Sequence, residues 1–326
     1  MSDKPSLLVT RQLVPSVMEA LRARFDVDVF DGEGAIARED LLKRVQGTAA
    51  ALTLLTEKVD AEFFDAAGPQ LRIVANHAVG YDNVDVPEAT RRGVPVSNTP
   101  DVLTETTADL AWALLLAAAR RIAEGDRFLR SRTPWIWGPQ MMMGVDIHGK
   151  TLGVVGFGRI GQAVARRASG FGMKVIYSSS SGPRKADGID AEHREFDDLL
   201  KEADFVSVNV ALNDATRHLF GEDEFRAMKP TAVLVNTARG PVVDEAALAR
   251  ALKAGEIFAA GIDVFEKEPE VHPELVECEN AVIIPHLGSA TIDTREAMGM
   301  LAVENLLAVF DGSEPPTLIN PEVWKG

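Results

Sequence analysis

The sequence predicts an α/β protein built from two doubly wound parallel-sheet domains. Short apolar runs alternate with helical segments in two successive rounds, and a glycine-rich turn follows the first apolar run of the second round. Strand–helix alternation of this kind is typical of parallel sheets that are covered by helices on both faces. The chain of 326 residues is long enough for two domains, each with a core of its own.

The two rounds can be assigned element by element. In the first round, strands are predicted at residues 6–10, 27–30, 49–55, 71–75 and 95–97, with helices at 14–25, 38–45, 61–67 and 86–92. In the second round, strands are predicted at residues 152–155, 174–177, 205–209, 232–236, 259–263 and 281–284, with helices at 160–169, 197–202, 222–228 and 245–254. Gly255 follows the last of these helices, where a C-terminal glycine cap is expected.

Two longer helical segments, residues 103–121 and 294–310, fit in neither round. We expect them to carry the chain from the first domain into the second and back. The first domain would then comprise residues 1–99 and 290–326, interrupted by a second domain at residues 100–289. The apolar run 108–119 contains Asp109 and is too short to span a bilayer, so we expect a helix buried on all sides. Ligands are expected in the cleft between the domains.

The glycine-rich turn has the spacing of a dinucleotide-binding motif. A strand at residues 151–155 leads into the sequence GFGRIG, and a helix follows. In such a motif Gly156 permits the tight turn, Gly158 lets the backbone approach a pyrophosphate, and Gly161 lets the helix pack close to the strand. The N–H groups and the dipole at the start of the helix favour the phosphate charge.

Composition excludes several classes of protein. The formal net charge of −15 argues against nucleic acid or an anionic membrane surface as a partner. The single cysteine, Cys278, permits no internal disulfide and favours a reducing compartment, so a cytoplasmic enzyme is expected. The histidines and Cys278 lack the spacing of a metal site, and no G-x-S-x-G nucleophile motif is present.

Several sequence blocks occur in the order that characterises the D-isomer-specific 2-hydroxyacid dehydrogenases. They are residues 76–85 (NHAVGYDNVD), 98–102 (NTPDV), 107–109 (TAD), 149–153 (GKTLG), the glycine turn, 235–240 (VNTARG), 261–269 (GIDVFEKEP) and 285–290 (PHLGSA). The chain resembles this family over nearly its whole length, and within it most resembles the glyoxylate/hydroxypyruvate reductases. The resemblance implies a Rossmann cofactor domain inserted in a flavodoxin-like substrate domain.

The resemblance assigns catalytic roles to Arg239, Glu268 and His286, each of which follows a predicted strand of the second round. His286 can give a proton to a carbonyl oxygen while a hydride reaches the carbonyl carbon. Glu268 would accept a hydrogen bond from the other ring nitrogen, and the planar guanidinium of Arg239 matches a substrate carboxylate. The implied activity is NAD(P)H-dependent reduction of a small 2-keto acid, such as glyoxylate or hydroxypyruvate, to the D-2-hydroxy acid.

The resemblance also implies binding residues. For the cofactor these are Thr107, Phe157, Gly158, Arg159, Ile160, Gly161, Ser179, Ser180, Ser181, Thr237, Ala238, Arg239, Asp263, His286 and Gly288. For the substrate they are Leu55, Val79, Gly80, Arg239 and His286. No basic residue lies at 54–57 or 78–81 to pair with a phosphate, which favours a small, unphosphorylated acid.

The second strand of the second round bears on the choice between NADP and NAD. NAD-binding domains usually place an acid at the end of this strand to bind the ribose 2′-OH, and here Ser179, Ser180 and Ser181 occupy that region. No acid follows until Asp187. NADP is therefore preferred, and NAD remains an alternative, because NADP-dependent relatives often have an arginine at the position of Ser180. Arg184 or Lys185 could substitute for it.

Two alternative functions remain open. One is another D-2-hydroxyacid dehydrogenase, such as a short form of phosphoglycerate dehydrogenase. The other is a non-enzymatic NAD(H)-sensing protein like the corepressors of the family, against which the charge of −15 weighs mildly. The resemblance further implies a homodimer, with contacts near residues 133–139, which contain Trp135 and Trp137.

Overall fold

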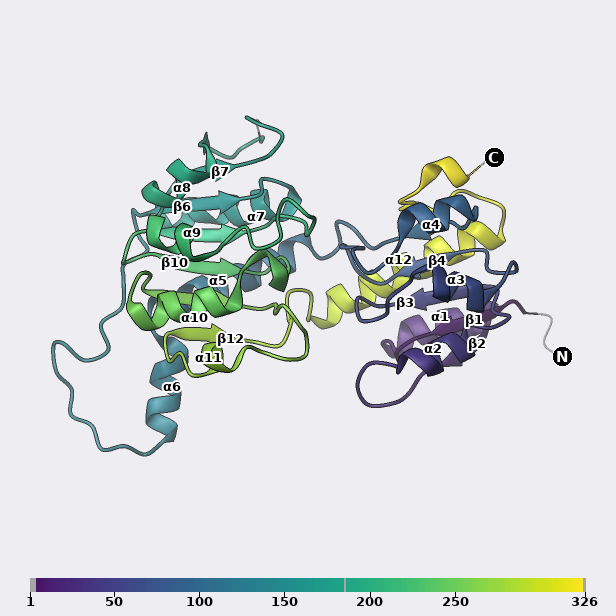
Figure 1. Ribbon diagram of the computed structural model, residues 1–326, viewed down its shortest axis with the longest axis horizontal. Helices are drawn as coiled ribbons and strands as arrows, with labels where there is room; N and C mark the ends of the chain where they lie inside the picture. The colour runs from purple at the N-terminus through teal and green to yellow at the C-terminus, as the bar shows by residue number, and fades with distance from the viewer. Residues whose placement is uncertain (1–3, 185, 325–326) are drawn as a thin grey trace. The chain divides into compact units, whose positions relative to one another are not determined.

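The computed structural model describes residues 4–184 and 186–324 (Figure 1). The chain divides into a first unit, Met1–Leu103 with Ala290–Gly326, and a second unit, Thr104–Ser289. The sequence prediction placed the first boundary after residue 99 and the second before residue 290. In the structure, the chain changes unit just before each of the two long helices, which begin at Thr104 and Ile292. Each of these helices therefore lies wholly in one unit.

The first unit contains a parallel sheet in the order β2-β1-β3-β4-β5. Its strands are β1 (Ser6–Val9), β2 (Asp26–Val29), β3 (Ala50–Thr53), β4 (Val74–Asn76) and β5 (Val96–Ser97). The helices α1 (Pro15–Arg24) and α12 (Ile292–Phe310) cover one face, whereas α2 (Arg38–Arg44), α3 (Ala61–Ala67) and α4 (Val86–Arg91) cover the other. The side chains of successive strand residues point to opposite faces of the sheet. Leu7 and Val9 pack in the core on the α1 side, and Leu8 packs in the core on the α3 side.

The second unit contains a parallel sheet in the order β12-β11-β10-β9-β6-β7-β8. Its strands are β6 (Thr151–Val155), β7 (Lys174–Ser178), β8 (Glu192–His193), β9 (Phe205–Val208), β10 (Val233–Asn236), β11 (Ala259–Ile262) and β12 (Ala281–Ile283). The helices α5 (Thr104–Ala119) and α7 (Arg159–Arg167) cover one face. The other face carries α8 (Phe196–Glu202), α9 (Glu222–Ala227), α10 (Glu245–Ala254) and α11 (Pro273–Val276).

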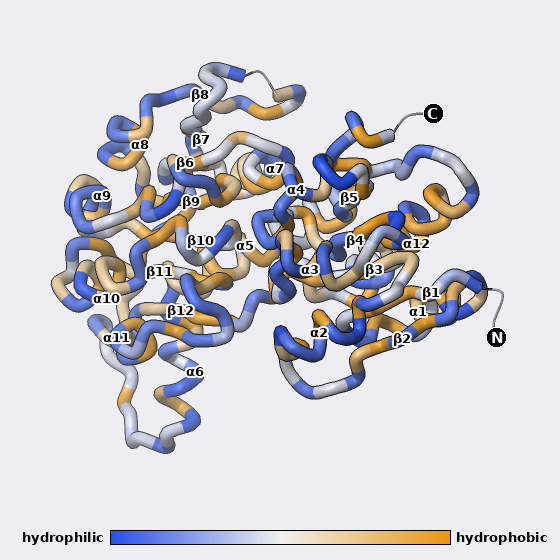
Figure 2. The backbone as a smooth tube through the Cα atoms, turned by 45° about the vertical axis from the view of Figure 1, so that its right-hand side comes forward, coloured by the Kyte–Doolittle hydropathy of each residue, from blue (hydrophilic) through white to orange (hydrophobic). Residues whose placement is uncertain are grey.

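The prediction of two doubly wound parallel-sheet domains is confirmed. Hydrophobic and hydrophilic stretches alternate along the chain in both units (Figure 2). The largest shift among the predicted strands is in β4, which was predicted at residues 71–75. The sequence did not reveal α6 (Ile122–Arg130), β8 or α11. α10 ends as predicted, because Gly255 adopts the left-handed conformation at its C-cap.

One expectation about α5 is wrong. Glu105, Asp109 and Ala113 are exposed along one side of the helix, so α5 is not buried on all sides. The charged positions make ion pairs, because Asp109 binds Arg167 at 2.6 Å and Glu105 binds Arg167 at 2.8 Å. A helix packed on one face of a sheet leaves its outer side to solvent. Among the described residues, no helix combines the length and apolar character that a membrane span requires.

The order of strands places the glycine turn at the centre of the second sheet. β6 pairs with β7 on one side and with β9 on the other. The strand order therefore reverses at β6, because β7 and β8 lie on one side of it and β9 to β12 lie on the other. Glycine is required in this turn by close backbone approaches. A Cβ on Gly161 would lie 2.1 Å from the Gly156 oxygen, and a Cβ on Gly156 would lie 2.6 Å from the Asn209 oxygen.

Candidate active site

Three neighbouring strands of the second unit end at the same edge of the sheet. β10, β11 and β12 are parallel and adjacent, and they are followed by Arg239, Glu268 and His286, respectively. Carboxyl ends of adjacent parallel strands meet at one edge, which is where open α/β sheets bind ligands. The topology therefore places all three predicted catalytic residues at that edge.

His286 and Glu268 form a hydrogen-bonded pair. Nδ1 of His286 lies 2.8 Å from Oε2 of Glu268, and the Phe265 N–H donates to Oε1 of the same carboxylate at 3.1 Å. Both side chains are about one-third exposed. Because Nδ1 is engaged, the Nε2 atom is the one that can exchange a proton with a ligand.

The electrostatics of this pair favour an ionised carboxylate. Burial alone would raise the pKa of Glu268, but the hydrogen bond and the charge of His286, aided by the Phe265 N–H, hold that pKa below its usual range. An ionised Glu268 accepts a hydrogen bond from the Nδ1–H group of His286. The pair thus fixes one imidazole tautomer, with the second ring nitrogen available for acid–base chemistry.

Asp263 holds the turn that presents His286. Its carboxylate is fully buried and accepts hydrogen bonds from the N–H groups of Leu287 at 2.5 Å and Gly288 at 2.9 Å. Burial raises the pKa of Asp263 to about 6, although the two N–H donors and the charge of His286 oppose the change. His286 itself has a φ of +52°, a left-handed conformation that a non-glycine residue adopts only when its surroundings enforce it.

Arg239 lies in a turn built by Asn236. The buried Asn236 side chain donates to the Arg239 carbonyl at 3.0 Å and accepts from the Ala238 N–H at 3.0 Å. The next residue, Gly240, touches the loop that carries Glu268, since a Cβ there would lie 1.8 Å from the Phe265 carbonyl carbon. Close backbone packing therefore couples the arginine turn to the Glu268 loop.

The glycine turn leads into a helix whose N-terminus lacks a side-chain cap. α7 begins after Gly158, and no side chain in the described chain caps it. Nothing lies within 4 Å of a Cβ placed on Gly158, so the space in front of the backbone is open. Free N–H groups at the start of a helix favour a bound anion.

Buried polar atoms without partners lie at the same sheet edge. Among the described residues, Asn209 Oδ1 and Thr237 Oγ1 are buried and have no hydrogen-bond partner. They follow β9 and β10, the two strands next to β6 on that side of the sheet. Buried polar groups are normally paired. Together with the open glycine turn, these atoms fit a polar ligand that extends along the edge, as a dinucleotide does.

Comparison with known proteins decides the family. The sequence model of the D-isomer specific 2-hydroxyacid dehydrogenase NAD-binding domain matches residues 112–288. The chain belongs to the D-isomer-specific 2-hydroxyacid dehydrogenase family. It is therefore an oxidoreductase that uses a nicotinamide cofactor, and the prediction of the family is confirmed.

Full-length relatives support the same assignment. Glyoxylate reductases of Thermococcus gammatolerans and Thermococcus onnurineus are 53% and 51% identical to this chain, over 99% and 98% of it and 98% and 97% of their own lengths. The structure of the NADPH-dependent glyoxylate/hydroxypyruvate reductase of Sinorhizobium meliloti with NADP and malonate is 34% identical, with a TM-score of 0.85 over 99% of both chains. A glyoxylate reductase from Paecilomyes thermophila gives a TM-score of 0.86 at 34% identity, over 98% of this chain and 99% of that one.

The cofactor residues predicted for this dehydrogenase occupy different environments in the second unit. Gly158 and Arg159 are exposed, Ile160 is partly buried, and Gly161 lies buried inside α7. The Phe157 side chain lies in the core, so only its backbone is available to a ligand. Ser179, Ser180 and Ser181 follow β7, with the hydroxyls of Ser179 and Ser181 2.9 Å apart. The Thr107 hydroxyl donates to the Gly288 carbonyl at 3.1 Å, and Ala238 is partly buried in the turn built by Asn236.

The predicted substrate residues Leu55, Val79 and Gly80 lie in two loops of the first unit, after β3 and β4, and are partly buried. Asn83 ties these loops together, because its Nδ2 donates to the carbonyl oxygens of Leu54 at 2.9 Å and Glu57 at 3.0 Å. This role of Asn83 was not predicted from the sequence. Asn83 stands three residues after Gly80 in the block of residues 76–85, and this position is the signal that could have revealed its role.

The buried Glu57 carboxylate shapes the first of these loops. It accepts hydrogen bonds from the Leu54 N–H at 2.7 Å and from the hydroxyls of Thr10 and Thr56, both at 2.5 Å. In the second loop, Asn76 Nδ2 donates to the Gly80 carbonyl at 3.1 Å. The backbone of both loops is therefore held by side chains of the same unit.

Two further carboxylates that the sequence analysis missed support the Glu268 loop. The Glu245 N–H donates to Oε1 of Glu266 at 3.0 Å, and the Glu266 N–H donates in return to Oε1 of Glu245. The buried Glu245 also accepts from the His272 N–H at 2.9 Å, and Glu266 contacts Nε2 of His218 at 2.9 Å. This reciprocal pair fastens the loop to the first turn of α10.

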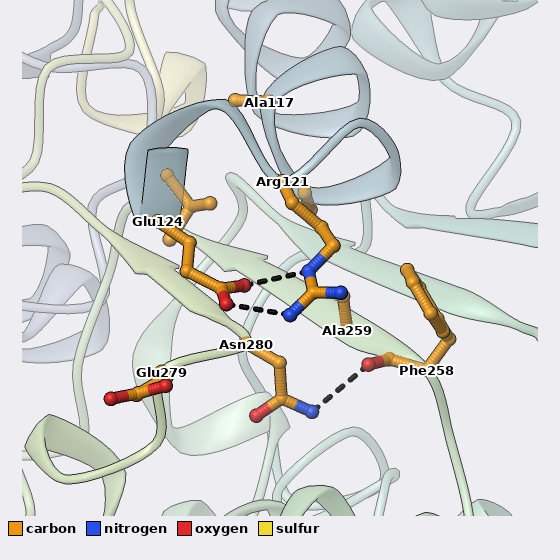
Figure 3. Close-up of a pocket in the computed structure, with 9 residues that line it drawn as sticks. Ala117, Arg121, Glu124, Phe258, Ala259, Glu279 and Asn280 are labelled. Carbon is orange, nitrogen blue, oxygen red and sulfur yellow. Dashed lines mark hydrogen bonds and ion pairs between the residues drawn. The ribbon is translucent and has the colours of Figure 1, made fainter. Parts of the chain in front are cut away.

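A separate cavity lies at the opposite edge of the second sheet. Its volume is about 210 Å³, and its lining includes Phe258 and Asn280, which directly precede β11 and β12 (Figure 3). The Arg121 guanidinium, held by Glu124 at 2.6 Å and 2.7 Å, forms part of the wall. The cavity lies at the amino ends of the strands and contains none of the predicted site residues, so it is not the active site.

Proposed function

We propose that this dehydrogenase reduces glyoxylate and hydroxypyruvate to the corresponding 2-hydroxy acids. The Glu268–His286 pair carries the proposal, because it places an oriented imidazole on the edge of the sheet that also holds Arg239 and the glycine turn. The glyoxylate reductases that align with nearly the whole chain support the substrate class. The absence of basic residues at 54–57 and 78–81 favours these acids over a phosphorylated one.

In the proposed mechanism the protein supplies the proton and the orientation. Bound NAD(P)H is the source of the hydride. Nε2 of His286 donates a proton to the carbonyl oxygen as that oxygen gains charge, while Glu268 retains the Nδ1 hydrogen bond and stabilises the imidazolium. Arg239 pairs with the substrate carboxylate through its planar guanidinium. In the oxidative direction, the neutral imidazole removes the hydroxyl proton.

Cofactor and substrate contacts are proposed residue by residue. We assign the pyrophosphate to the N-terminus of α7 at Gly158–Ile160, and the nicotinamide half to the edge formed by Thr237, Asp263 and Gly288. The buried, unpaired Thr237 hydroxyl supports this assignment. In the first unit, we retain Leu55, Val79 and Gly80 as substrate-binding residues on the basis of the family resemblance.

We further propose that NADPH is preferred to NADH, with both cofactors accepted. The serine run after β7 presents no carboxylate to repel a 2′-phosphate, and its hydroxyls can donate to one. The Sinorhizobium meliloti relative is described as NADPH-dependent. No arginine stands at residue 180, so the preference is expected to be moderate.

A homodimer is the proposed assembly, and the cytoplasm remains the expected compartment. Trp135, Ile136 and Trp137 lie in an extended segment after α6, and their exposed fractions are 52%, 90% and 76%. Large exposed apolar side chains that gather on one segment mark interaction surfaces. Light scattering on the purified protein tests this assembly.

A steady-state panel tests the proposed function. Oxidation of NADPH and NADH is followed at fixed pH with glyoxylate, hydroxypyruvate, pyruvate and phosphohydroxypyruvate. We expect the highest kcat/KM with the two proposed acids and NADPH, and a fall in kcat of about 10²–10⁴-fold for His286→Asn, the usual contribution of a positioned acid. A higher kcat/KM with phosphohydroxypyruvate would instead indicate a phosphoglycerate dehydrogenase. Absence of turnover with all four, despite tight cofactor binding, would indicate a sensor.

A further inference from the structure

A buried tyrosine holds the loop that follows β7. The Tyr177 side chain is only 2% exposed, yet its hydroxyl reaches the backbone of Arg184. The hydroxyl donates to the Arg184 carbonyl at 2.7 Å and accepts from the Arg184 N–H at 2.6 Å. One phenol therefore satisfies both backbone groups of a residue that lies seven positions along the chain.

The same tyrosine is joined to the glycine turn. Its ring stacks on Phe157 with a centroid separation of 3.9 Å and an interplanar angle of 17°. Phe157 stands between Gly156 and Gly158, and both rings are buried in the core on the α7 side of the sheet. Through Tyr177, the turn proposed to bind the pyrophosphate and the backbone of Arg184 are held in a defined relation.

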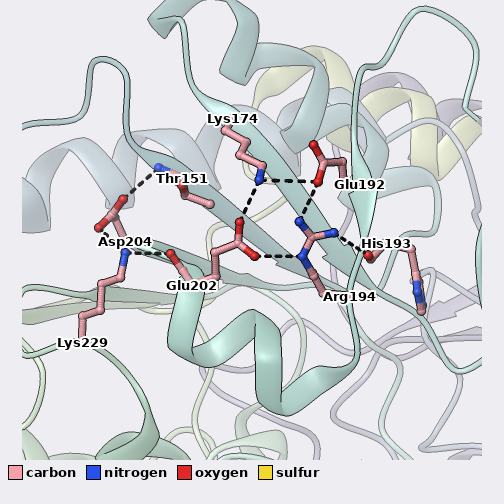
Figure 4. Close-up of polar contacts among 8 residues, drawn as sticks. All are labelled: Thr151, Lys174, Glu192, His193, Arg194, Glu202, Asp204 and Lys229. Carbon is pink, nitrogen blue, oxygen red and sulfur yellow. Dashed lines mark hydrogen bonds and ion pairs between the residues drawn. The ribbon is translucent and has the colours of Figure 1, made fainter.

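The far end of the loop is held by contacts that do not involve the Tyr177 hydroxyl. The Arg194 N–H donates to the Tyr177 carbonyl at 2.9 Å, directly after β8. Glu192 contacts Lys174 at 3.5 Å and Arg194 at 2.6 Å, and both basic side chains also bind Glu202 at 2.8 Å (Figure 4). These ion pairs fasten β8 to β7 and α8, whereas the loop near Arg184 is held by the Tyr177 hydroxyl and by Ala186 and Ile189, which pack against the core.

The Arg184 side chain remains available to a ligand. Within residues 4–184 and 186–324, its guanidinium makes no hydrogen bond or ion pair, and the residue is exposed. Along the loop that follows β7, no acidic residue precedes Asp187. The backbone of Arg184 is fixed and its charged end is not, which suits a residue that meets an anionic group.

We propose that Tyr177 is a positioning residue for cofactor choice: it fixes Arg184 where the guanidinium can pair with the 2′-phosphate of NADP(H). This proposal rests on the proposed preference for NADPH. Tyr177 contributes no contact to the cofactor itself and acts through Arg184. The preference for the phosphate thus depends on a hydroxyl buried beneath the loop as well as on the exposed residues of the loop.

Binding of cofactor fragments tests the proposal without catalysis. The dissociation constants of 2′,5′-ADP and 5′-AMP are measured by calorimetry for wild type, Tyr177→Phe, Arg184→Ala and the double variant. Arg184→Ala is expected to weaken 2′,5′-ADP by about tenfold, the effect of one charge-assisted hydrogen bond. Tyr177→Phe, which keeps the stacked ring, should weaken it by about three- to tenfold and leave 5′-AMP within about twofold.

The double variant separates positioning from general support. If Tyr177 acts through Arg184, Tyr177→Phe should add little to the loss caused by Arg184→Ala. Glu192→Gln, which loosens the other anchor of the loop, serves as the matched control and should keep the ratio of the two affinities. Hydrogen exchange offers a second readout, because the Arg184 N–H should lose protection in Tyr177→Phe while the β7 amides keep theirs.

The outcomes distinguish this inference from the cofactor proposal. If Tyr177→Phe binds 2′,5′-ADP as tightly as wild type while Arg184→Ala does not, the positioning role is refuted and NADPH preference stands. Equal losses for both fragments in Tyr177→Phe would show general support of the domain and would also refute it. If wild type binds 2′,5′-ADP no more tightly than 5′-AMP, the proposed NADPH preference fails first.

Discussion

Gly240→Ala should disable the enzyme by shifting the Glu268 loop. The added Cβ would lie 1.8 Å from the Phe265 carbonyl carbon, 1.9 Å from its oxygen and 2.5 Å from the Glu266 nitrogen, and real Cβ contacts are essentially never shorter than 3.0 Å. All three neighbours are backbone atoms, so the loop must retreat by about 1.2 Å, the difference between 3.0 and 1.8 Å. Glu268 lies three residues further on, and its 2.8 Å contact with His286 would lengthen toward 4 Å.

The expected loss follows from that displacement. A misplacement of about 1 Å in a catalytic group can cost about 10²-fold in rate, so kcat for glyoxylate should fall by about that factor. Overpacking of this kind also costs about 1–3 kcal/mol of stability. The assay measures kcat and KM at saturating NADPH, alongside thermal unfolding.

Gly170→Ala is the matched control for Gly240→Ala. Gly170 lies in the same unit, its φ is not in the left-handed region, and nothing lies within 4 Å of a Cβ placed there. This variant should keep wild-type kcat. A Gly240→Ala enzyme with kcat within about twofold of wild type would show that the backbone contact does not position Glu268.

Three further predictions address separate parts of the protein. Burial raises the pKa of Asp263 from its ordinary value of 3.8 to about 6, so the native state binds more protons than the unfolded state in that window. Wild type should therefore lose up to ~3 kcal/mol of stability as pH rises from about 4 to 6, and Asp263→Asn should lack this slope in unfolding experiments. Asn83→Ala removes two hydrogen bonds to loop carbonyls, worth about 1 kcal/mol each. Because these bonds hold the proposed substrate loops, KM for glyoxylate should rise more than kcat falls. An unchanged KM would contradict the role of Asn83 in holding these loops. Ser179→Asp should shift kcat/KM toward NADH by about tenfold or more, because a carboxylate repels the 2′-phosphate and binds the ribose hydroxyls; an unchanged ratio would show that residue 179 does not face the ribose.

Local patterns were sufficient to predict most of the elements. The strands and most helices follow from apolar runs and helical segments of a few residues each, and the glycine spacing at 156–161 identifies the dinucleotide turn. Both signals depend only on residues that are close together in the sequence. The three residues of the proposed triad were found because each belongs to a short block of the family, not because their contacts could be foreseen.

Contacts between distant segments required the tertiary structure. Glu245 and Glu266 are 21 residues apart, and no periodicity predicts their reciprocal hydrogen bonds. The stack of Phe157 on Tyr177 exists because β6 and β7 are neighbours in the sheet, which decides the partner of each side chain. Likewise, the outer side of α5 was predicted to be buried because composition alone does not say which side of an apolar helix meets the sheet.

By itself, therefore, the sequence determined the α/β class, the two rounds of strands and helices, the glycine turn and the family. The tertiary structure decided the order of strands, the pairing of His286 with Glu268 at 2.8 Å and the buried support beneath each loop. The physical reason is one of range. Backbone conformation and the periodicity of burial are determined by residues that are neighbours in the sequence. Hydrogen bonds and ion pairs at the site join side chains that are far apart in the sequence and that only the folded sheet brings together.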